Sequence, residues 1–511
     1  MKRSLVTLLI AVITLSCMFV GCGGAGDKIG NSEQDLEIVL WQSGYGRDYL
    51  DTIIEAYKTK HPEVNISLTA SAGKDNEPIY SNPDTNTVDL YFTSFPEYGS
   101  VVNYNGRQIL EDLNGVLDMK ADGETKTLRE KFGSNILNAV TNSEGKIYSL
   151  PWYHSLCGLI YNVDMFRENG WDCPRTTEEL VSLAEVINSS GKTPFIHYAD
   201  YWKYMYEAWV AQYESISNYQ DIWKGIYTDP AGEKHANDVR FITESQGRYE
   251  SYKVLSELLG PKGNVYKSSN SLDHTRSQTY FLDGRAVMMP GGSWVENEMK
   301  EHASQFNYGI MKTPVISAIV KILPDRSVSN ERELCALINA IDAGDTSLEG
   351  TGYSVTQNDY DRVKDARNLF YISGQADVLL PAYSTAKDVA KDFLRFYFSD
   401  EAMQIAITQA SMLATVQKDS GEFDYSKNSD FIRDCHDKSK SSTIIISSLV
   451  EKLMYAGGIS QLFKYDPVKK LTYSTNKNDF MELDDYWNNL EKKYWIDNWD
   501  QILTNAGLQN A

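Results

Sequence analysis

The sequence has few cysteines and lacks the common catalytic motifs. Four of its six cysteines follow the leader segment, Cys157, Cys173, Cys335 and Cys435, and they form no CxxC pair and have no nearby histidine at metal spacing. We therefore expect no metal and no cofactor, and we expect Cys157, in an apolar run, to be a small buried hydrophobe. The motifs GxSxG, GxxxxGK[ST] and HExxH are also missing, which argues against three large enzyme classes.

Positive charge is scarce as well. The 49 Lys and Arg are outnumbered by 70 Asp and Glu, which gives a formal net charge of −21. Nucleic acid and anionic lipid headgroups are therefore excluded as expected partners, and the charge is best explained as a solvated surface. By contrast, 33 Tyr and 10 Trp give a high aromatic content that suits ligand binding. A length of 511 residues predicts two or three domains.

The first residues predict export. Lys2 and Arg3 precede an apolar run over residues 5–20, followed by Gly21-Cys22-Gly23-Gly24. This pattern indicates a signal peptide over residues 1–21 and resembles a lipobox in which Cys22 is acylated, with residues 22–35 as a flexible tether. Cys17 is the rival acceptor, but no Gly-rich segment follows it. We expect a monomer on the extracytoplasmic face of the cell membrane, held there only by its lipid.

The segment after the tether predicts an α/β fold. A strand over residues 36–40 ends in Trp41, and Leu50, Ile53, Ile54 and Tyr57 form one apolar face of a helix that stops at His61-Pro62. Strands follow over 64–71 and 88–94. This alternation is typical of a mostly parallel sheet, in which ligands bind beyond the carboxyl ends of the strands.

Residues 144–188 contain the most specific pattern, "EGKIYSLPWYHSLCGLIYN" followed by "CPRTTEELVSLAEVIN". A strand over 147–150, a break at Pro151, a buried strand through Leu159 and Ile160, and a helix capped by Thr176 with Glu179 closing a capping box are predicted. This stretch resembles the crossing between lobes in the extracellular solute-binding proteins of carbohydrate ABC transporters, the family of the maltose-binding protein. The segments "YFLDGRAVMMPGGSWVENEM", "FNYGIMKTPV" and "AYSTAKDVAKDFLRFYFSDEAMQ" resemble the same family in the same order.

The resemblance implies a type II-like periplasmic-binding-protein fold of two lobes joined by hinge crossings. Lobe 1 would comprise residues 36–150 plus about 380–425, and lobe 2 residues 151–379 plus about 426–511. Residues 317–375 form an insertion in lobe 2 that the classical proteins lack. The ligand would be a carbohydrate, most plausibly an oligosaccharide, and the partner an ABC permease.

A sugar site needs flat aromatic rings and a few polar groups, because sugars present C–H bonds on their faces and hydroxyls at their rims. The candidates lie at strand ends and lobe crossings: Trp41, Tyr45, Trp152, Tyr153, Trp202, Trp294, Tyr383, Asp89, Glu97 and Asp200. By the resemblance, Trp294 stacks on sugar. For the three carboxylates a surface or capping role is the competing interpretation. Trp209 and the C-terminal Trp487, Trp495 and Trp499 are expected to pack in the core or on the second lobe.

Two other functions compete with the non-enzymatic receptor. A tethered acidic protein with many Trp and carboxylates also suits a cell-surface glycoside hydrolase, which needs two carboxylates about 5 to 10 Å apart. A glycan-binding lipoprotein of helical repeats is the third, and the lack of a fixed-period repeat counts against it.

Overall fold

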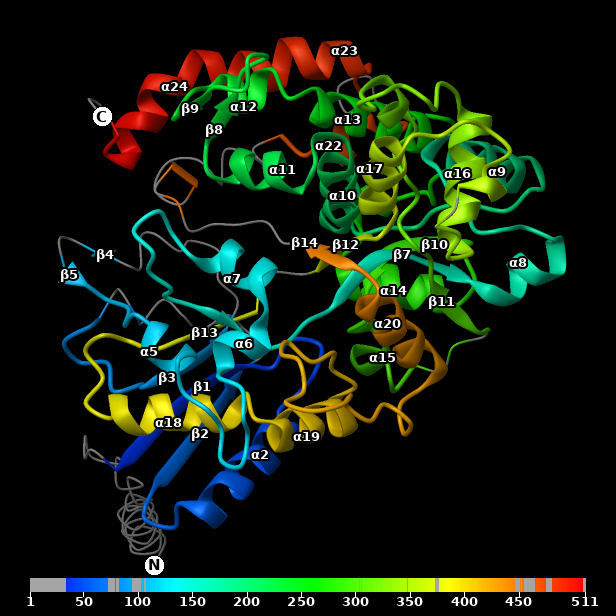
Figure 1. The fold of residues 1–511 in the computed structure, drawn as a ribbon. Coiled ribbons are helices and arrows are strands. Elements are labelled where there is room, and N and C mark those ends of the chain that lie inside the picture. The colour runs from blue at the N-terminus through cyan, green and yellow to red at the C-terminus, as the bar shows by residue number, and fades with distance from the viewer. Residues whose placement is uncertain are drawn as a thin grey trace, which may run out of the picture.

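The structure is a computed structural model that describes residues 34–71, 79, 82–93, 103–104, 107–302, 304, 306–346, 348–372, 376–445, 451, 453–454, 465–474 and 480–508. The signal peptide, Cys22, most of the tether and Glu97 lie outside the described residues. Within them the chain forms two lobes, one around each of two five-stranded sheets (Figure 1).

The first sheet has the strand order β2-β1-β3-β13-β6. Its strands are β1 (Asp35–Trp41), β2 (Asn65–Ser71), β3 (Leu90–Thr93), β6 (Leu150–Pro151) and β13 (Asp377–Leu379). Alternate residues of β1 are buried, Leu36, Ile38 and Leu40, and they join the core that α2 (Asp48–Lys60) and α18 (Lys387–Tyr397) complete. α19 (Asp400–Ala410) packs beside α2.

The second sheet has the order β10-β7-β12-β14, with β11 also paired to β7. Its strands are β7 (Leu156–Asn162), β10 (Met288–Gly292), β11 (Tyr308–Ile310), β12 (Leu369–Ile372) and β14 (Thr443–Ile445). α10 (Lys203–Glu214) packs against β7, β10 and β12, and α20 (Asp430–Lys440) packs against β11.

One strand in each sheet runs against the others. β13 is antiparallel to β3 and β6, and β7 is antiparallel to β10, β11 and β12, whereas β1 is parallel to β2 and β3 and β12 is parallel to β14. Both reversed strands come directly after the chain has crossed from the other lobe. They therefore run away from the interface between the lobes, and all their neighbours run toward it. The carboxyl ends of these neighbours face one interface, where ligands of such sheets bind.

The remaining elements surround the two sheets. They are β4 (Asn103–Tyr104), β5 (Arg107–Gln108), α5 (Asn114–Leu117), α6 (Leu128–Phe132), α7 (Ser134–Val140), α8 (Val163–Asn169), α9 (Thr177–Ser189), η1 (Ala199–Trp202), α11 (Ile216–Trp223), β8 (Ile226–Thr228), β9 (Lys234–Ala236), α12 (Arg240–Thr243), α13 (Gln246–Leu259), η2 (Ser269–Ser271), α14 (His274–Leu282), α15 (Val295–Glu298), η3 (Ser317–Lys321), α16 (Glu331–Asp342), η4 (Glu349–Thr351), α17 (Gln357–Arg367), α22 (Pro467–Leu471), α23 (Leu483–Asp485), the π-helical η6 (Tyr486–Lys492) and α24 (Lys493–Ala506). None of the described helices is long and apolar enough to cross a membrane.

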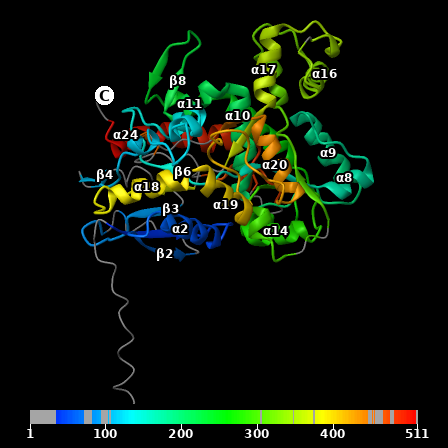
Figure 2. The same ribbon diagram turned by 60° about the horizontal axis from the view of Figure 1, so that its bottom comes forward.

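The insertion over 317–375 forms η3, α16 and α17 and then supplies β12 to the second sheet. Its helices project from the second lobe on the side away from the first lobe (Figure 2). Of the elements that the structure describes in the insertion, β12 is the one that reaches the interface, at its carboxyl end.

The local predictions hold with two exceptions. α2 ends before His61 as expected, and Trp495 of α24 packs against Phe241 of the second lobe with ring centroids 5.8 Å apart. The predicted strand over 147–150 is confined to β6. The capping box at α9 is half formed: Thr176 accepts from the Glu179 amide, but the Glu179 carboxylate accepts from the Arg175 amide and guanidinium instead of closing on Thr176.

Candidate functional site

The two lobes touch where the loop after β1 meets the residues after β10. A Cβ atom added to Gly44 would lie 3.2 Å from Cβ of Trp294, and the side-chain amide of Asn297 donates to the Gly44 carbonyl at 2.7 Å. This contact joins the carboxyl end of a strand in the first sheet to the carboxyl end of a strand in the second.

Trp294 lies at the centre of an aromatic group on the second lobe. Its ring meets Tyr201 and Tyr204 at centroid distances of 5.3 and 5.7 Å, both edge to face, and 8% of the residue is exposed. Gly292 makes room for this ring, because a Cβ there would lie 2.1 Å from its Cζ3 atom.

Tyr45 and Tyr153 face this group from the first lobe and the crossing. Their ring centroids are 4.6 Å apart, and the Tyr45 hydroxyl lies 2.7 Å from Oγ of Ser155. Burial raises the pKa of Tyr45 well above its ordinary value, and it raises the pKa of Tyr153 as well. Both hydroxyls are therefore neutral groups that can donate and accept hydrogen bonds.

Trp152 supports the site from below. It is fully buried, stacks on Tyr49 at 6.2 Å, meets Phe92 and Tyr153 edge to face, and donates to the carbonyl of Thr93 at 3.4 Å. Of the two aromatics predicted at the crossing, Tyr153 thus lies toward the interface, and Trp152 packs beneath Tyr153 in the buried core.

Asp377 is a carboxyl at the same edge that the sequence analysis missed. It is paired in register with Thr93 and Pro151, and 8% of it is exposed. Burial raises its pKa to about 7, although a hydrogen bond with Ser149 acts in the opposite direction. Asp377 follows the predicted insertion and lies outside the segments on which the family resemblance rests.

Trp202 lies away from the interface. It is fully buried in the core of the second lobe, meets Phe195 at 5.4 Å and donates to Nδ1 of His197 at 3.0 Å. The preceding residue, Tyr201, and Tyr204 take the place expected for it, because η1 turns the chain before α10 begins. Trp209 is buried in the core as predicted.

Asp89 and Tyr383 lie at the opposite end of the first sheet. Asp89 precedes β3 and accepts from the Glu37 amide and the Ser384 hydroxyl, and Tyr383 binds Asn86 and the Ile79 carbonyl. Asp89 is at the amino end of β3 because it precedes that strand, and Tyr383 is there because β13, which leads to it, runs against β3. The structure therefore separates both from Trp294.

Two more candidates lie at the surface or at a strand end. Asp200 is exposed and accepts from the Tyr198 hydroxyl at 2.7 Å. Trp41 is half-buried at the carboxyl end of β1, next to the loop that contains Tyr45.

The arrangement offers aromatic faces and neutral hydroxyls from both sides of one interface. In the described part of the chain the one group that could hold a metal is Asp229, Glu233 and His235, on the β8–β9 hairpin outside this interface. The Asp229 carboxylate already accepts from two backbone amides of that turn.

A family model described as bacterial extracellular solute-binding protein matches residues 52–431, about three quarters of the chain. The chain belongs to this family. Among curated relatives, this solute-binding protein is 22% identical over 278 residues to a multiple sugar-binding protein of Streptococcus mutans, covering 52% of this chain and 59% of the relative. It is 22% identical over 332 residues to the diacetylchitobiose binding protein NgcE of Streptomyces coelicolor, covering 59% and 65%. The match thus spans less than two thirds of either relative.

Solved structures show the same two-lobe fold. The solute-binding protein RafE in complex with raffinose has a TM-score of 0.55 at 15% identity, covering 90% of this chain and 99% of that chain. A chitin oligosaccharide binding protein has a TM-score of 0.56 at 18% identity, covering 92% and 100%. The predicted fold class, α/β with two lobes, is confirmed.

Proposed function

We propose that this solute-binding protein captures a carbohydrate, an oligosaccharide in particular, between its lobes and delivers it to an ABC permease. The observation that carries the proposal is the pair of facing aromatic groups, Tyr45 and Tyr153 on one side and Trp294 with Tyr201 and Tyr204 on the other. Rings on both sides can stack on the faces of a sugar, and the neutral hydroxyls can bind its rim.

Closure of the lobes would be the mechanistic step, and no bond would be broken. In the structure the lobes touch at Gly44 and Trp294. A sugar that contacts both groups favours the closed state over the open one, because it binds the closed state more tightly. Burial of one aromatic against a sugar ring contributes about 1 to 3 kcal/mol, so two or three such contacts with several hydrogen bonds suffice for micromolar affinity.

The proposed receptor is a tethered monomer. We propose that Cys22 carries the lipid that holds the protein at the outer face of the cell membrane, and that the lobes divide near residues 150, 380 and 425. β12 belongs to the second sheet and β13 to the first, which supports a return crossing a few residues before 380. Trp41 and Asp200 stay in the proposed site as neighbours of its aromatic groups, and Asp377 joins it.

Calorimetry against a panel of mono- and oligosaccharides, with a product assay on the same sugars, tests the proposal. We expect heat of binding for at least one oligosaccharide and no new reducing ends. Turnover of any sugar would instead establish the alternative, a cell-surface glycoside hydrolase. Binding of glycans that are too long to fit between two lobes would favour a glycan-binding lipoprotein without a transport role.

A further inference from the structure

A second hollow lies on the other side of the first crossing. It has a volume of about 600 Å³ and is lined by residues of both lobes: Lys126, residues 131–136, His154, residues 413–418, residues 421–423, Tyr425, His436, Ser439, Lys440, Ser442 and Ile444. This volume is within the usual range of small-molecule sites, roughly 300 to 1,000 Å³. We call it the hinge pocket.

The hinge pocket is separated from the aromatic site by the crossing itself. Successive side chains of an extended segment point to opposite sides. Tyr153 points toward Tyr45, whereas the next residue, His154, lines the hinge pocket. The backbone amide of His154 donates to the carbonyl of Leu413 at 3.3 Å, so the first crossing is bonded to the segment of the first lobe that follows α19.

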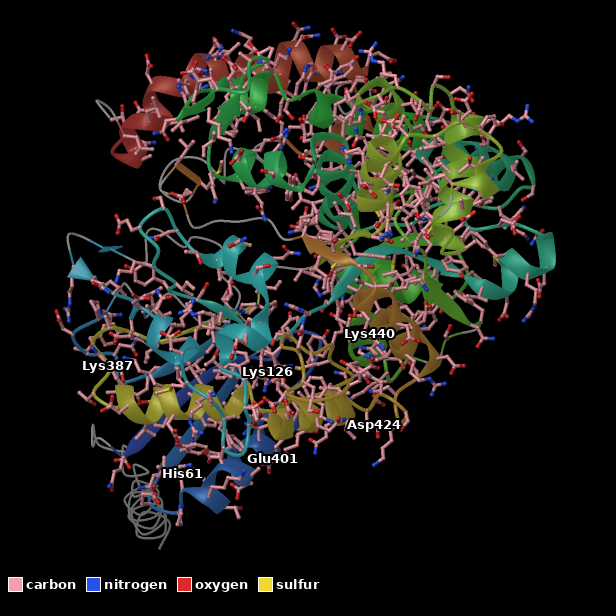
Figure 3. All side chains as sticks on the ribbon, in the orientation of Figure 1. His61, Lys126, Lys387, Glu401, Asp424 and Lys440 are labelled. Atoms are coloured by element: carbon pink, nitrogen blue, oxygen red, sulfur yellow. The ribbon has the colours of Figure 1, made fainter. Side chains whose placement is uncertain are left out.

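Lysines outnumber carboxylates in the lining, in a chain whose formal net charge is −21. Lys126, Lys131, Lys418 and Lys440 contribute to it, against one carboxylate, Glu422, which pairs with Lys440 at 2.6 Å. Figure 3 labels Lys126 on the first lobe and Lys440 at the end of α20, so positive charge comes from both lobes.

Two of these lysines have no ion pair but lie near negative charge, since the Asp419 carboxylate interacts with Lys126 and the Asp424 carboxylate interacts with Lys418. Lys131 is fully buried and is neutralised by Glu124 and Asp400. Among the described residues, Lys126 and Lys418 form no ion pair, and their recorded hydrogen bonds go to backbone carbonyls.

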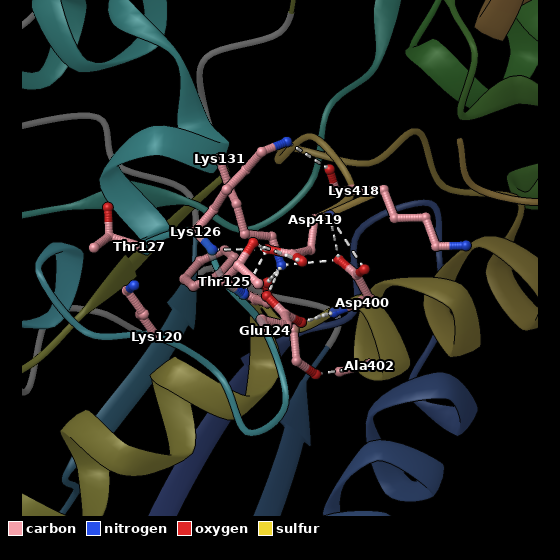
Figure 4. Close-up of polar contacts among 12 residues, drawn as sticks. Lys120, Glu124, Thr125, Lys126, Thr127, Lys131, Asp400, Ala402, Lys418 and Asp419 are labelled. Carbon is pink, nitrogen blue, oxygen red and sulfur yellow. Dashed lines mark hydrogen bonds and ion pairs between the residues drawn. The ribbon is translucent and has the colours of Figure 1, made fainter. Parts of the chain in front are cut away.

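The segments that carry Lys126 and Lys418 are held in place. The Asp419 carboxylate accepts from the amides of Thr125 and Lys126 at 2.9 and 2.7 Å, and the Asp419 amide donates to Asp400 (Figure 4). Lys126 also donates to the carbonyl of Lys418 at 3.3 Å. The cationic wall is therefore preorganised, which reduces the entropy that a ligand would have to offset.

Polar groups without partners also face the hinge pocket. In the described part of the chain, Nε2 of His154 and the hydroxyl of Thr415 are buried and have no hydrogen-bond partner, with 5% and 3% of these residues exposed. A buried polar atom left unpaired is costly. Burial lowers the pKa of His154 to about 4, so its imidazole is neutral and can either donate or accept.

Aromatic surface completes the lining. Tyr425 stacks on His436 with ring centroids 3.9 Å apart, and Phe132 and Phe423 also line the hollow. The hinge pocket thus offers cations, unpaired hydrogen-bonding groups and flat apolar faces together.

We propose that the hinge pocket is a second ligand site, which takes a small molecule with a phosphate or carboxylate group on a polar ring or chain. Lys126, Lys418 and Lys440 bind the anionic group, and His154 and Thr415 bind hydroxyls. Because its walls come from both lobes, a ligand in the hinge pocket favours the angle between the lobes seen in the structure. It is therefore coupled to the aromatic site, and the coupling is reciprocal.

The test is calorimetry of the whole exported chain with inorganic phosphate, glucose 6-phosphate, glucuronate and glucose, at constant ionic strength set with chloride. We expect saturable binding of at least one of the three anions and a smaller radius of gyration in its presence. Binding of phosphate or glucose 6-phosphate would indicate a site for a phosphate group. Binding of glucuronate would indicate a site for a carboxylate group.

Four variants locate the binding. Lys126→Gln with Lys418→Gln, and separately Lys440→Gln on the other lobe, are each expected to weaken anion binding about tenfold or more. The matched control, Lys192→Gln with Lys262→Gln, changes the same charge on exposed lysines outside the hinge pocket and is expected to leave it unchanged. Trp294→Ala is also expected to keep anion binding, which separates this site from the aromatic one.

Three results would overturn the proposal. The first is no saturable binding of any anion up to about 10 mM, which is weaker than the range of ordinary ligands. The second is an equal loss of binding in the control variant. The third is a loss in Trp294→Ala as large as the loss in the lysine variants. A chain that binds anions at the hinge pocket but no sugar would refute the proposed function and leave this one standing.

Discussion

Asn297 of the second lobe donates a hydrogen bond to the backbone carbonyl of Gly44 in the first lobe at 2.7 Å. It lies one turn after Trp294, whose Cβ approaches the same glycine. A polar and an apolar contact thus hold the lobes together at one point, and each can be removed separately.

Asn297→Ala is expected to shift the protein without ligand toward the open state. One hydrogen bond contributes about 1 kcal/mol, which corresponds to roughly a fivefold change in the ratio of closed to open molecules. Small-angle scattering would show a larger radius of gyration. Asn307→Ala is the control, because Asn307 binds Asp164 within the second lobe. An equal change in both variants would contradict an interlobe role.

Trp294→Ala is expected to reduce sugar affinity by about 2 kcal/mol or more, since it removes the central ring of the second lobe. Trp202→Phe is the comparison. It removes the bond to His197 inside the core and is expected to lower the free energy of unfolding by about 2 to 4 kcal/mol with little effect on affinity. Calorimetry and thermal melting measure both. The reverse pattern would place Trp202 in the site and Trp294 in the core.

Gly292→Ala is expected to weaken sugar binding about tenfold, because the new methyl group displaces the Trp294 ring from its place. Gly115→Ala is the matched control. Gly115 lies in α5, and a Cβ there meets no atom within 4 Å. If Gly292→Ala bound sugar as the unaltered chain does, the position of the ring would not matter for binding.

Asp377→Asn is expected to change how stability depends on pH. The folded carboxyl has a pKa of about 7, above its ordinary value of 3.8, so between these values the folded chain binds a proton that the unfolded chain has released. Stability therefore falls as pH rises through this window, by about 1.4 kcal/mol per unit from this group. The variant removes that decline. Urea unfolding at pH 5 and pH 8 gives the change in the free energy of unfolding with pH for the unaltered chain and for the variant. An equal change in both proteins would contradict a buried, protonated Asp377.

Much of the fold follows from periodicity. β1 and α2 have apolar residues at the strand and helix spacings, and both form within one or two residues of the expected bounds. β6 is shorter than expected because one ladder to β13 pairs only two of its residues. That pairing joins distant parts of the chain, so local pattern could not reveal it.

The site was predictable in its larger features only. Trp294 and Tyr153 follow from strand ends and from family resemblance, and both lie at the interface. Tyr201 was missed because the helical spacing of Trp202, Met205 and Trp209 drew attention to the buried face of α10. Tyr383 was misplaced because the direction of β13 cannot be known before its partner is. Asp89 was misplaced because it lies at the start of the strand and not at its carboxyl end.

The reversed strand β13 also has a consequence for how the protein is made. β3 pairs with β13 in the first sheet, and the Tyr57 hydroxyl binds Asp392, a residue 335 positions later. A chain that emerges from its amino end has β1, β2 and β3 long before their partner, and closing so long a loop is slow. The first lobe thus completes its sheet only after the part of the second lobe that precedes β13 has been synthesised.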